Sequence, residues 1–460
     1  MTASATALAA RAALKEVEPL ATSLSVYSTE ASRVSSALSD DLMVGARRRR
    51  VRSGEPDPVS TVALMVTEDD VLLWREGGAT APAAERRQIR RAVLDSGGEL
   101  VELYQYEKLE PNQINAFLTQ VDCSLNPVEG LQTLTLSRGA GAPTAGPPLS
   151  VPLKGRKRRL ILIHGTFSRS GALLDGMSRA SNGAQFFKRI FSHYEEVLVF
   201  DHPTLSVSPV LNAFDLFRLV ADARGPLDVI AHSRGGLVAR WVLEGLGSGL
   251  AADPCQAVLV GAPLGGTSLA SPPRLRDALS ILSNLGTVLK GAGASPLTYQ
   301  PLIAAPLALL RIASSVVGAG GRMPVIDAAI SMIPGLAAQS RVDLNHELAR
   351  LRECKPAKPP TYFVVRANFE TEEPGWRFWK WFRRDQVADS GADRVFPGPN
   401  DLVVDTSSMA ELVAPVPNSP QKGMAAQHVH DFKTTETVHH TNYFEQEATL
   451  DFILRKLQIP

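Results

Sequence analysis

The sequence predicts an α/β fold built around a doubly wound, mostly parallel sheet. Short runs that are apolar at almost every position recur along its second half, and strands of this kind are buried on both faces, as in a parallel sheet. Helical stretches separate the runs, and this alternation is typical of a doubly wound domain. The expected strands are residues 159–163, 197–200, 227–231, 257–260 and 362–366, and the clearest helices between them are residues 213–223 and 236–246.

Composition and charge narrow the class of protein. The chain has 460 residues, of which 44% are hydrophobic, and its 48 Lys and Arg nearly balance its 47 Asp and Glu. This balance favours neither nucleic acid nor an anionic surface as a partner. Its three cysteines, Cys123, Cys255 and Cys354, are far apart and form neither a metal-ligand pattern nor a disulfide framework. We therefore expect a cytoplasmic protein with no metal and no other cofactor.

Changes in composition divide the chain into segments. Residues 1–54 are rich in Ala and Ser and predict a flexible or helical N-terminal segment, whereas residues 55–138 predict a small α+β module. Residues 139–150, rich in Gly and Pro, predict a linker. Residues 151–460 hold the α/β domain. Within the module we expect a hairpin over 61–67 and 71–75, helices over 84–94 and 112–120, and strands over 99–106 and 131–137.

The α/β domain contains a helical insertion at about residues 268–354, between two expected strands. We expect it to form a lid over the carboxyl edge of the sheet, where ligands bind in this class of fold. Its most apolar stretch, residues 301–318, is interrupted by Pro306 and Arg311 and is shorter than the ~20 apolar residues that a membrane span needs. We therefore expect no transmembrane segment. The first twenty residues also lack the uninterrupted apolar core of a secretory signal.

Ser233 is the strongest candidate for a catalytic residue. The apolar run 227–231 leads into His232-Ser233-Arg234-Gly235-Gly236 and then directly into a helix. A serine at such a strand-to-helix turn needs small residues two positions before and after it, because the backbone is sharply bent. Ala231 and Gly235 occupy these positions. The turn exposes the serine oxygen at the start of a helix, which favours a developing negative charge; the alternative is an ordinary tight turn.

An earlier turn, His164-Gly165-Thr166, follows the expected strand 159–163. Gly165 allows the chain to bend so that a backbone N–H points toward the oxygen of a tetrahedral intermediate. We expect one such N–H from Thr166, with Phe167 as the alternative, and a second from Arg234. Gly165, Phe167 and His232 are further expected to line the substrate-binding site.

A serine nucleophile of this kind needs an acid and then a histidine later in the chain. Asp401 is the preferred acid, because it lies in a turn after Pro399 and Asn400; Asp405 and Asp393 are the alternatives. His440 is the preferred base. It lies in VHHTNYF, where a polar turn is followed by aromatic residues, and His439 beside it is the alternative.

These motifs resemble the lipase and esterase branch of the α/β-hydrolase superfamily, and they are similar to bacterial lipases and GPI-inositol-deacylase-like members. The resemblance covers about residues 150–460 and is carried by RLILIHGT, VLVFDHPT, AHSRGG, VGAPLGGTS and NDLVV…HHTNYF. It implies the α/β-hydrolase fold, with Ser233 as nucleophile, His440 as its general base and Asp401 orienting the base. One departure is that the acid comes more than 30 residues after its strand. Residues 261–268 resemble a turn near the mouth of the family's site.

The expected activity is cleavage of carboxylic esters through an acyl-enzyme on Ser233. An acyltransferase with the same residues, and a partner-binding module with a vestigial hydrolase fold, are the alternatives. The substrate is expected to be a lipid or other long-chain ester, because leucines of the insertion could line an acyl pocket or else pack the insertion on itself. These leucines are Leu297, Leu302, Leu307, Leu309 and Leu310.

Two further regions raise questions about partners. Residues 375–384, GWRFWKWFRR, hold three of the five tryptophans beside four basic residues. Such a run is typical of an amphipathic helix packed on the insertion or the N-terminal module, and peripheral membrane contact is the alternative partner. The N-terminal module is a candidate for binding a protein partner. No nucleic-acid-binding module accompanies these features, so no nucleic-acid partner is expected.

Overall fold

The computed structural model describes residues 4–23, 59–76, 99–107, 109–137, 139, 141–270, 275–317, 332–341, 345–376, 378–379, 382, 396, 398–413 and 424–460. By its internal contacts the chain divides into two compact units. Unit 1 comprises Met1–Ser124, Pro272–Met332 and Glu373–Val395, and unit 2 comprises Leu125–Ser271, Ile333–Glu372 and Phe396–Pro460. Each unit is therefore assembled from segments that are far apart in the sequence.

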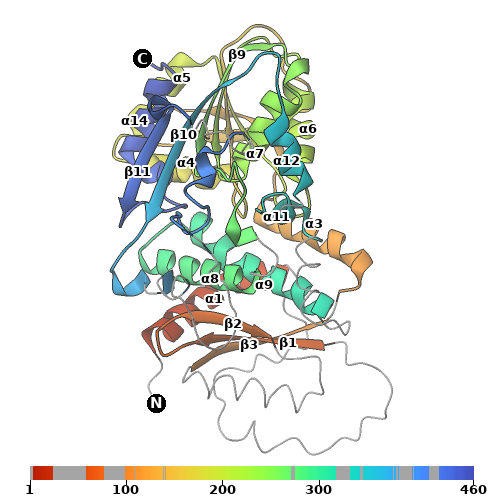
Figure 1. Ribbon diagram of the computed structural model, residues 1–460, viewed down its shortest axis with the longest axis vertical. Helices are drawn as coiled ribbons and strands as arrows, with labels where there is room; N and C mark the ends of the chain where they lie inside the picture. The colour runs from red at the N-terminus through yellow and green to blue at the C-terminus, as the bar shows by residue number, and fades with distance from the viewer. Residues whose placement is uncertain are drawn as a thin grey trace, which may run out of the picture. The chain divides into compact units, whose positions relative to one another are not determined.

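Unit 2 is built on an eight-stranded sheet with the strand order β11–β10–β9–β8–β6–β7–β4–β5. Figure 1 labels β9, β10 and β11 of this sheet. The six strands from β11 to β7 are parallel, whereas β4 and β5 at one edge are antiparallel. All five strands expected in the α/β domain are confirmed, and β11, with its mostly polar sequence, was not expected. The parallel strands are β6 (Arg159–Ile163), β7 (Glu196–Asp201), β8 (Gly225–His232), β9 (Ala252–Val260), β10 (Thr361–Phe369) and β11 (Val429–Thr435).

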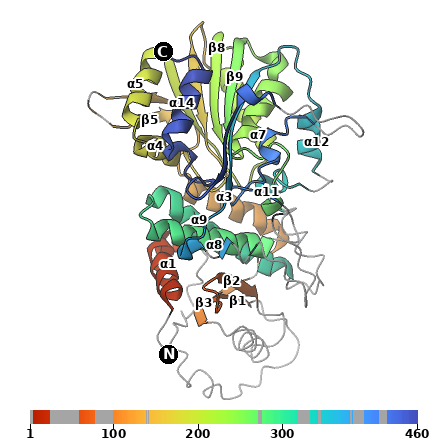
Figure 2. The same ribbon diagram turned by 60° about the vertical axis from the view of Figure 1, so that its left-hand side comes forward.

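Helices cover both faces of this sheet, because its strands are apolar on both sides. In β6, Leu160 and Leu162 join one buried cluster, whereas Ile161 and Ile163 join another. Figure 2 shows α4, α5 and α14 on one side of β8 and β9, and α7 on the other. This arrangement is the α/β-hydrolase fold that the resemblance implied. The covering helices are α4 (Ser170–Arg179), α5 (Gly183–His193) and α14 (Glu447–Lys456) on the first face, and α6 (Pro209–Val220) and α7 (Gly235–Arg240) on the second.

Residues 139–150 do not form the expected linker throughout, because part of this segment is a strand of the large sheet. β4 (Gly130–Thr135) pairs with β7, and β5 (Thr144–Pro148) pairs with β4 at the sheet edge. Proline lacks a backbone N–H and is tolerated on an edge strand, where the outer side needs no donor. The module expected at 55–138 therefore loses its last part, from Leu125 onward, to unit 2.

Unit 1 contains a three-stranded antiparallel sheet with the order β2–β1–β3. The predicted hairpin is confirmed as β1 (Val59–Val66) and β2 (Leu72–Glu76), and β3 (Glu99–Glu107) pairs with β1. A 3-10 turn, η2 (Pro111–Gln113), and α3 (Ile114–Leu125) confirm the helix expected at 112–120. The helix expected at 84–94 lies outside the described residues.

Helices of the insertion complete unit 1, together with α1 (Ala5–Ser23). Asn284 of α8 (Leu275–Gly291) accepts a hydrogen bond from Leu72 N and donates to Leu72 O, at 3.0 and 2.8 Å. The side chain thus takes the place of a neighbouring strand at the edge of β2. Tyr299 of α9 (Pro296–Val317) donates to Glu16 of α1 at 2.5 Å. The insertion is therefore divided: α8 and α9 belong to unit 1, and residues from 333 onward belong to unit 2. Its role as a lid stays a prediction.

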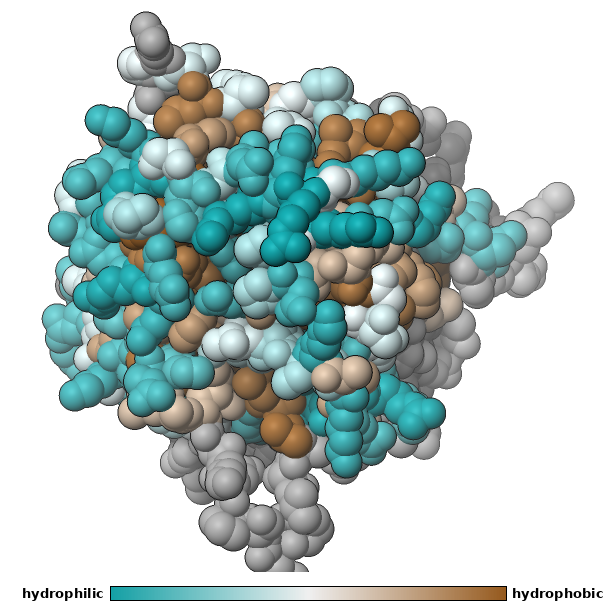
Figure 3. Space-filling view, turned by 90° about the horizontal axis from the view of Figure 1, so that it is seen from above, coloured by the Kyte–Doolittle hydropathy of each residue, from teal (hydrophilic) through white to brown (hydrophobic). Residues whose placement is uncertain are grey.

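One face of the molecule can be followed in a space-filling view (Figure 3). The face seen in Figure 3 is mostly hydrophilic, with separate small apolar patches of the kind that protein surfaces usually carry. None of the helices that the structure describes is both long and apolar enough to cross a membrane. Much of the tryptophan-rich run 375–384, including Trp381, lies outside the described residues.

Candidate active site

Ser233 lies at a strained turn between β8 and α7. Its φ angle is +53°, a left-handed conformation that is uncommon for a residue with a side chain. Its backbone N–H donates to Val260 O of β9 at 2.9 Å, which fixes the turn to the sheet. The residue is 4% exposed. The backbone strain expected of a nucleophile elbow is thus present.

Two glycines make room for this turn. A Cβ at Gly165 would lie 2.6 Å from Ser233 Cβ and 3.2 Å from Ser233 Oγ. A Cβ at Gly235 would lie 2.6 Å from His164 O. Contacts below 3.0 Å are not tolerated by real Cβ atoms, so both positions require glycine. The two turns that the sequence analysis singled out therefore pack directly against each other.

Asp401 and His440 form a buried pair. His440 Nδ1 lies 2.8 Å from Asp401 Oδ2, and the backbone N–H of His440 donates to Asp401 O at 3.0 Å. The N–H groups of Val403 and Val404 donate to Asp401 Oδ1 at 3.1 and 2.8 Å. In the neutral tautomer consistent with this pairing, Nδ1 carries the proton and Nε2 is left as the basic nitrogen.

The Tyr443 hydroxyl also donates to Asp401 Oδ2, at 3.0 Å. Burial, with the nearby Asp401 carboxylate, raises the pKa of Tyr443 well above its usual value, so the hydroxyl stays a donor. Sequence reasoning missed this residue. The only available signal was its place three residues after His440, in the same aromatic turn.

The competing candidates make different contacts. His439 Nδ1 lies 3.0 Å from Thr441 Oγ1, and burial lowers the pKa of His439 to about 3. Asp405 accepts hydrogen bonds from the backbone N–H and hydroxyl of Ser268, at 2.9 and 3.1 Å. Asp393 lies outside the described residues. Among the described candidates, the structure therefore pairs Asp401 with His440.

Ser233 and the Asp401–His440 pair lie at the same edge of the sheet. Gly261 directly follows Val260, the residue that binds the Ser233 backbone. A Cβ at Gly261 would lie 3.3 Å from His440 Nδ1 and 3.4 Å from Asp401 Oδ2. Gly261 also has a positive φ of +58°, which favours glycine. One residue thus connects the two parts of the site.

His232 provides a second connection. Its Nε2 lies 2.9 Å from His440 O, and the two rings are 4.8 Å apart. Burial, followed by the neighbouring His440, lowers the pKa of His232 to about 3, so the ring is neutral near pH 7. A neutral ring with a proton on Nε2 donates to the carbonyl. These contacts favour a role for His232 in holding His440, rather than the predicted role in contacting the substrate.

The candidate oxyanion donors come from both turns. Phe167, with a φ of +54°, donates its N–H to Thr204 Oγ1 at 3.4 Å, which favours Thr166 as the amide donor of this loop. Arg234 begins the helical turn after Ser233, and its buried guanidinium donates to Val207 O and Asn212 Oδ1, each at 2.6 Å. Its side chain therefore helps to fix the backbone that follows Ser233.

A buried polar cluster supports the first of these turns. His164 Nδ1 lies 2.9 Å from Gly165 O, and the His202 N–H donates to His164 Nε2 at 3.1 Å. Ser170 donates to both oxygens of Asp201, at the end of β7, from its N–H and its hydroxyl at 2.7 and 2.6 Å. The carbonyl of the Gly165–Thr166 peptide is thus held by a side chain, which fixes the direction of its N–H.

The loop that carries Asp401 is fixed by its neighbours, although it follows β10 at a distance in the sequence. Asn400 N donates to Asn368 Oδ1 at 3.0 Å, and Phe369 N donates to Asn400 O at 2.8 Å. These contacts place Asp401 beside the end of its strand, and the intervening residues 373–395 belong to unit 1. The acid is thus distant from its strand in the sequence but adjacent to it in the structure.

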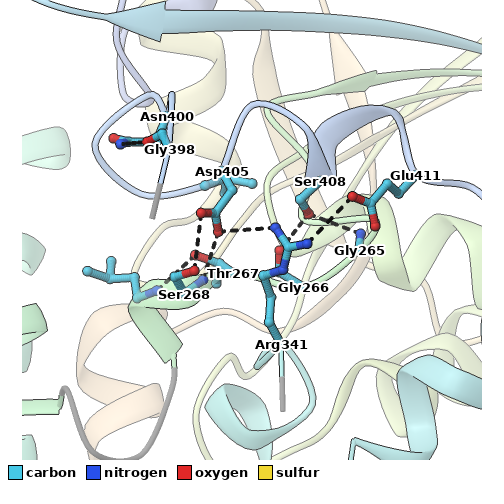
Figure 4. A network of polar contacts seen from close by, with 12 residues as sticks. Gly265, Gly266, Thr267, Ser268, Arg341, Gly398, Asn400, Asp405, Ser408 and Glu411 are labelled. Carbon is cyan, nitrogen blue, oxygen red and sulfur yellow. Dashed lines mark hydrogen bonds and ion pairs between the residues drawn. The ribbon is translucent and has the colours of Figure 1, made fainter. Parts of the chain in front are cut away.

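Figure 4 shows a network that ties the turn at residues 261–268 to the acid loop. Arg341 contacts Asp405 at 3.8 Å and Glu411 at 3.6 Å. Ser408 accepts the N–H of Gly265 at its hydroxyl, at 3.0 Å. The turn that resembled a feature of the site mouth therefore acts, in the structure, as a support for the acid loop.

Among the described residues, no group of three His, Cys, Asp or Glu side chains is arranged to hold a metal ion. The groups gathered at the sheet edge are a hydroxyl, an imidazole with a carboxylate partner, and backbone amides. Such a set is suited to acyl transfer through a covalent serine intermediate.

Solved structures to which this chain is similar include lipases and an epoxide hydrolase. The mature lipase BlEst2 of Bacillus licheniformis is 11% identical, with 70% of this chain and 100% of that chain covered, at a TM-score of 0.35. Lipase 1 of Pelosinus fermentans is 12% identical, with 66% and 99% covered, at a TM-score of 0.39. The Cif epoxide hydrolase of Acinetobacter nosocomialis is 12% identical, with 76% and 97% covered, at a TM-score of 0.32. Similarities this low leave the activity to be argued from the site.

A comparison with curated proteins found no match. One family model, described as a domain of unknown function (DUF7379), matches residues 138–458, which is most of the chain. The matched residues include β5, the whole parallel sheet and the three residues Ser233, Asp401 and His440. The chain therefore belongs to the family described as domain of unknown function DUF7379.

Proposed function

We propose that this protein is a serine hydrolase that cleaves carboxylic esters through an acyl-enzyme on Ser233. The observation that carries the proposal is the Asp401–His440 pair, with 2.8 Å between carboxylate and imidazole, at the sheet edge where Ser233 occupies a strained turn. A structural serine has no need of a positive φ, and strain of this kind concentrates at functional sites.

In the proposed reaction, Ser233 Oγ attacks the ester carbonyl carbon while His440 Nε2 takes the hydroxyl proton. The carbonyl oxygen becomes an oxyanion, which the backbone N–H groups of Thr166 and Arg234 stabilise. The intermediate collapses, the C–O bond to the alcohol breaks, and His440 gives its proton to the departing alcohol. Water then attacks the acyl-enzyme by the same route and releases the carboxylic acid and Ser233.

Asp401 has two tasks in this reaction. It holds the tautomer that leaves His440 Nε2 free to accept a proton, and its negative charge stabilises the imidazolium that forms. Donors from Val403, Val404 and Tyr443 fix both carboxylate oxygens, so the imidazole is oriented before substrate binds.

The described structure does not favour a particular acyl chain length. Leu302, Leu307, Leu309 and Leu310 of α9 are each 7% exposed or less. Such burial is what packing of the insertion on itself predicts, and an acyl pocket lined by these leucines stays a prediction. A series of p-nitrophenyl esters from acetate to octanoate would measure the preference, and a marked preference for octanoate would support the long-chain substrate expected from the sequence.

The proposal is tested by comparing wild type with Ser233→Ala on p-nitrophenyl esters. We expect turnover to fall by ~10⁴-fold or more, because the variant lacks the nucleophile. Ser206→Ala, a partly exposed serine on the loop after β7, provides a matched control that keeps the nucleophile. Near-normal hydrolysis by Ser233→Ala would refute the proposal. Transfer of the acyl group to an added alcohol in place of water would identify an acyltransferase.

A further inference from the structure

A short segment between β9 and β10 connects three loops at the carboxyl edge of the sheet. It consists of α11 (Pro334–Ala337) and the residues that follow it to position 340, and we name it the 334–340 strap. The loops at residues 164–167, 202–205 and 261–268 follow β6, β7 and β9. Because β6 and β9 flank β8 in the sheet, these loops surround the turn that carries Ser233.

Gln339 lies near the end of the strap and is 4% exposed. The Thr166 hydroxyl donates to its Oε1 at 3.1 Å, and its Nε2 donates to Gly335 O at 2.6 Å. Its backbone carbonyl accepts the N–H of Thr267 at 2.7 Å. Both ends of the amide are therefore used, so that neither a carboxylate nor an apolar side chain of this length reproduces its contacts.

The strap also reaches the loop after β7. Gly335 N donates to Leu205 O at 3.0 Å, and a Cβ at Gly335 would lie only 1.9 Å from Thr204 O. Thr204 in turn accepts the N–H of Phe167 through its hydroxyl. The strap therefore holds Thr166 directly, through Gln339, and the next residue indirectly, through Thr204.

We propose that Gln339 is a positioning residue that fixes Thr166 so that its backbone N–H faces the oxyanion, an inference that rests on the proposed function. Because the Thr166 hydroxyl is bound to Gln339, Thr166 acts through its main chain. The peptide between Gly165 and Thr166 is then held at its carbonyl by His164 and at its far end by Gln339. An amide that is fixed before substrate binds stabilises the oxyanion without reorganising during the reaction.

The test compares full-length wild type with Gln339→Leu and Thr166→Val on one p-nitrophenyl ester. The fraction of active enzyme is titrated with a fluorophosphonate, so that kcat is expressed per reactive serine. We expect kcat to fall about 10-fold in each variant with little change in KM, less than the ~10²–10³-fold loss on deleting an oxyanion donor. Gln185→Leu, which replaces an exposed glutamine on α5, is the matched control and should keep the wild-type kcat.

The double variant Thr166→Val/Gln339→Leu separates positioning from general support. We expect its kcat to equal that of the single variants, because both substitutions break the same hydrogen bond. A fall of about 100-fold in the double variant would mean independent effects and would overturn the inference. An unchanged kcat per reactive serine, with only a lower Tm or a smaller active fraction, would also overturn it, since that is the result of a purely structural role. Wild type without esterase activity would instead refute the proposed function itself.

Discussion

The turn at Ser233 and the Asp401–His440 pair are held in opposite ways. The turn at Ser233 fits because Gly165 and Gly235 have no side chains, since a Cβ at either position would collide with the opposite turn. Asp401 and His440 are held by groups that are present, including the Tyr443 hydroxyl and the backbone N–H groups of a tight loop. The first arrangement is steric and the second is polar, so different substitutions should damage each.

Among the polar contacts, replacement of His440 is expected to reduce ester hydrolysis the most. His440→Gln should lower kcat/KM of ester hydrolysis by ~10⁴-fold or more, because His440 is the proposed acceptor of the serine proton. His439→Gln is the matched substitution at the neighbouring position, and its effect should stay within about tenfold, since a ring held by Thr441 has no part in the reaction. Equal losses in the two variants would remove the distinction between these histidines.

The acid offers a similar pair. Asp401→Asn should lower kcat by about 10⁴-fold, because an amide favours the wrong imidazole tautomer and does not stabilise the imidazolium. Asp405→Asn should lower the thermal stability instead, since Asp405 contacts Ser268 and Arg341. Kinetics and thermal unfolding of both variants test this. If Asp405→Asn proved the more damaging to kcat, the acid would have to be reassigned.

Each side of the site also carries a buried histidine that is neutral in the folded state. Burial lowers the pKa of His232 and of His439 to about 3, below the usual value of 6.5. The unfolded chain therefore binds more protons between these pH values, so the stabilisation is complete above pH 6.5 and is lost as the pH falls toward 3. Urea unfolding from pH 7 to 4 should show a free energy of unfolding that declines by up to ~1.4 kcal/mol per pH unit per histidine.

Replacing one of these histidines isolates its share. His232→Gln should have a flatter decline than wild type over the same pH range, whatever its stability at pH 7. A decline of the same slope in wild type and variant would show that His232 is already protonated in the folded protein.

A substitution at Gly235 tests the steric arrangement and should have the weakest consequence. Gly235→Ala should lower the free energy of unfolding by about 1–3 kcal/mol, because its Cβ overlaps with His164 O. Gly291→Ala at the end of α8 is the control: nothing lies within 4 Å of its added Cβ, and the change should stay within about 0.5 kcal/mol. Chemical unfolding measures both. Similar values would mean that the tight packing at Gly235 has no energetic consequence.

The turn at Ser233 and the Asp401–His440 pair also differ in how far the sequence alone predicts them. The elbow was predicted because its requirements are local: an apolar strand, a serine and glycines at fixed spacing, all within one continuous stretch around Ser233. The order of acid and base along the chain narrowed the choice to a few residues, including Asp401 and His440. The actual pairing required the structure, because His439 and His440 differ only in the direction of their side chains.

Other features depended on contacts that no local pattern records. β5 escaped prediction because Gly and Pro normally mark a linker, and only its edge position makes them acceptable. The insertion was expected as one body, but α8 completes the sheet of unit 1 through Asn284, whereas Gln339 lies in unit 2. Polar residues of this kind gain their role from a partner more than a hundred residues away.

The proposed reaction requires a hydroxyl at position 233 whose reactivity depends on the imidazole of His440. Its most direct test is fluorophosphonate labelling of the folded wild-type protein, with the modified residue identified by mass spectrometry of peptides. We predict a single adduct on Ser233 that is lost in Ser233→Ala and forms far more slowly in His440→Gln. Folded protein that takes up no label, or takes it up at another serine, would contradict the claim.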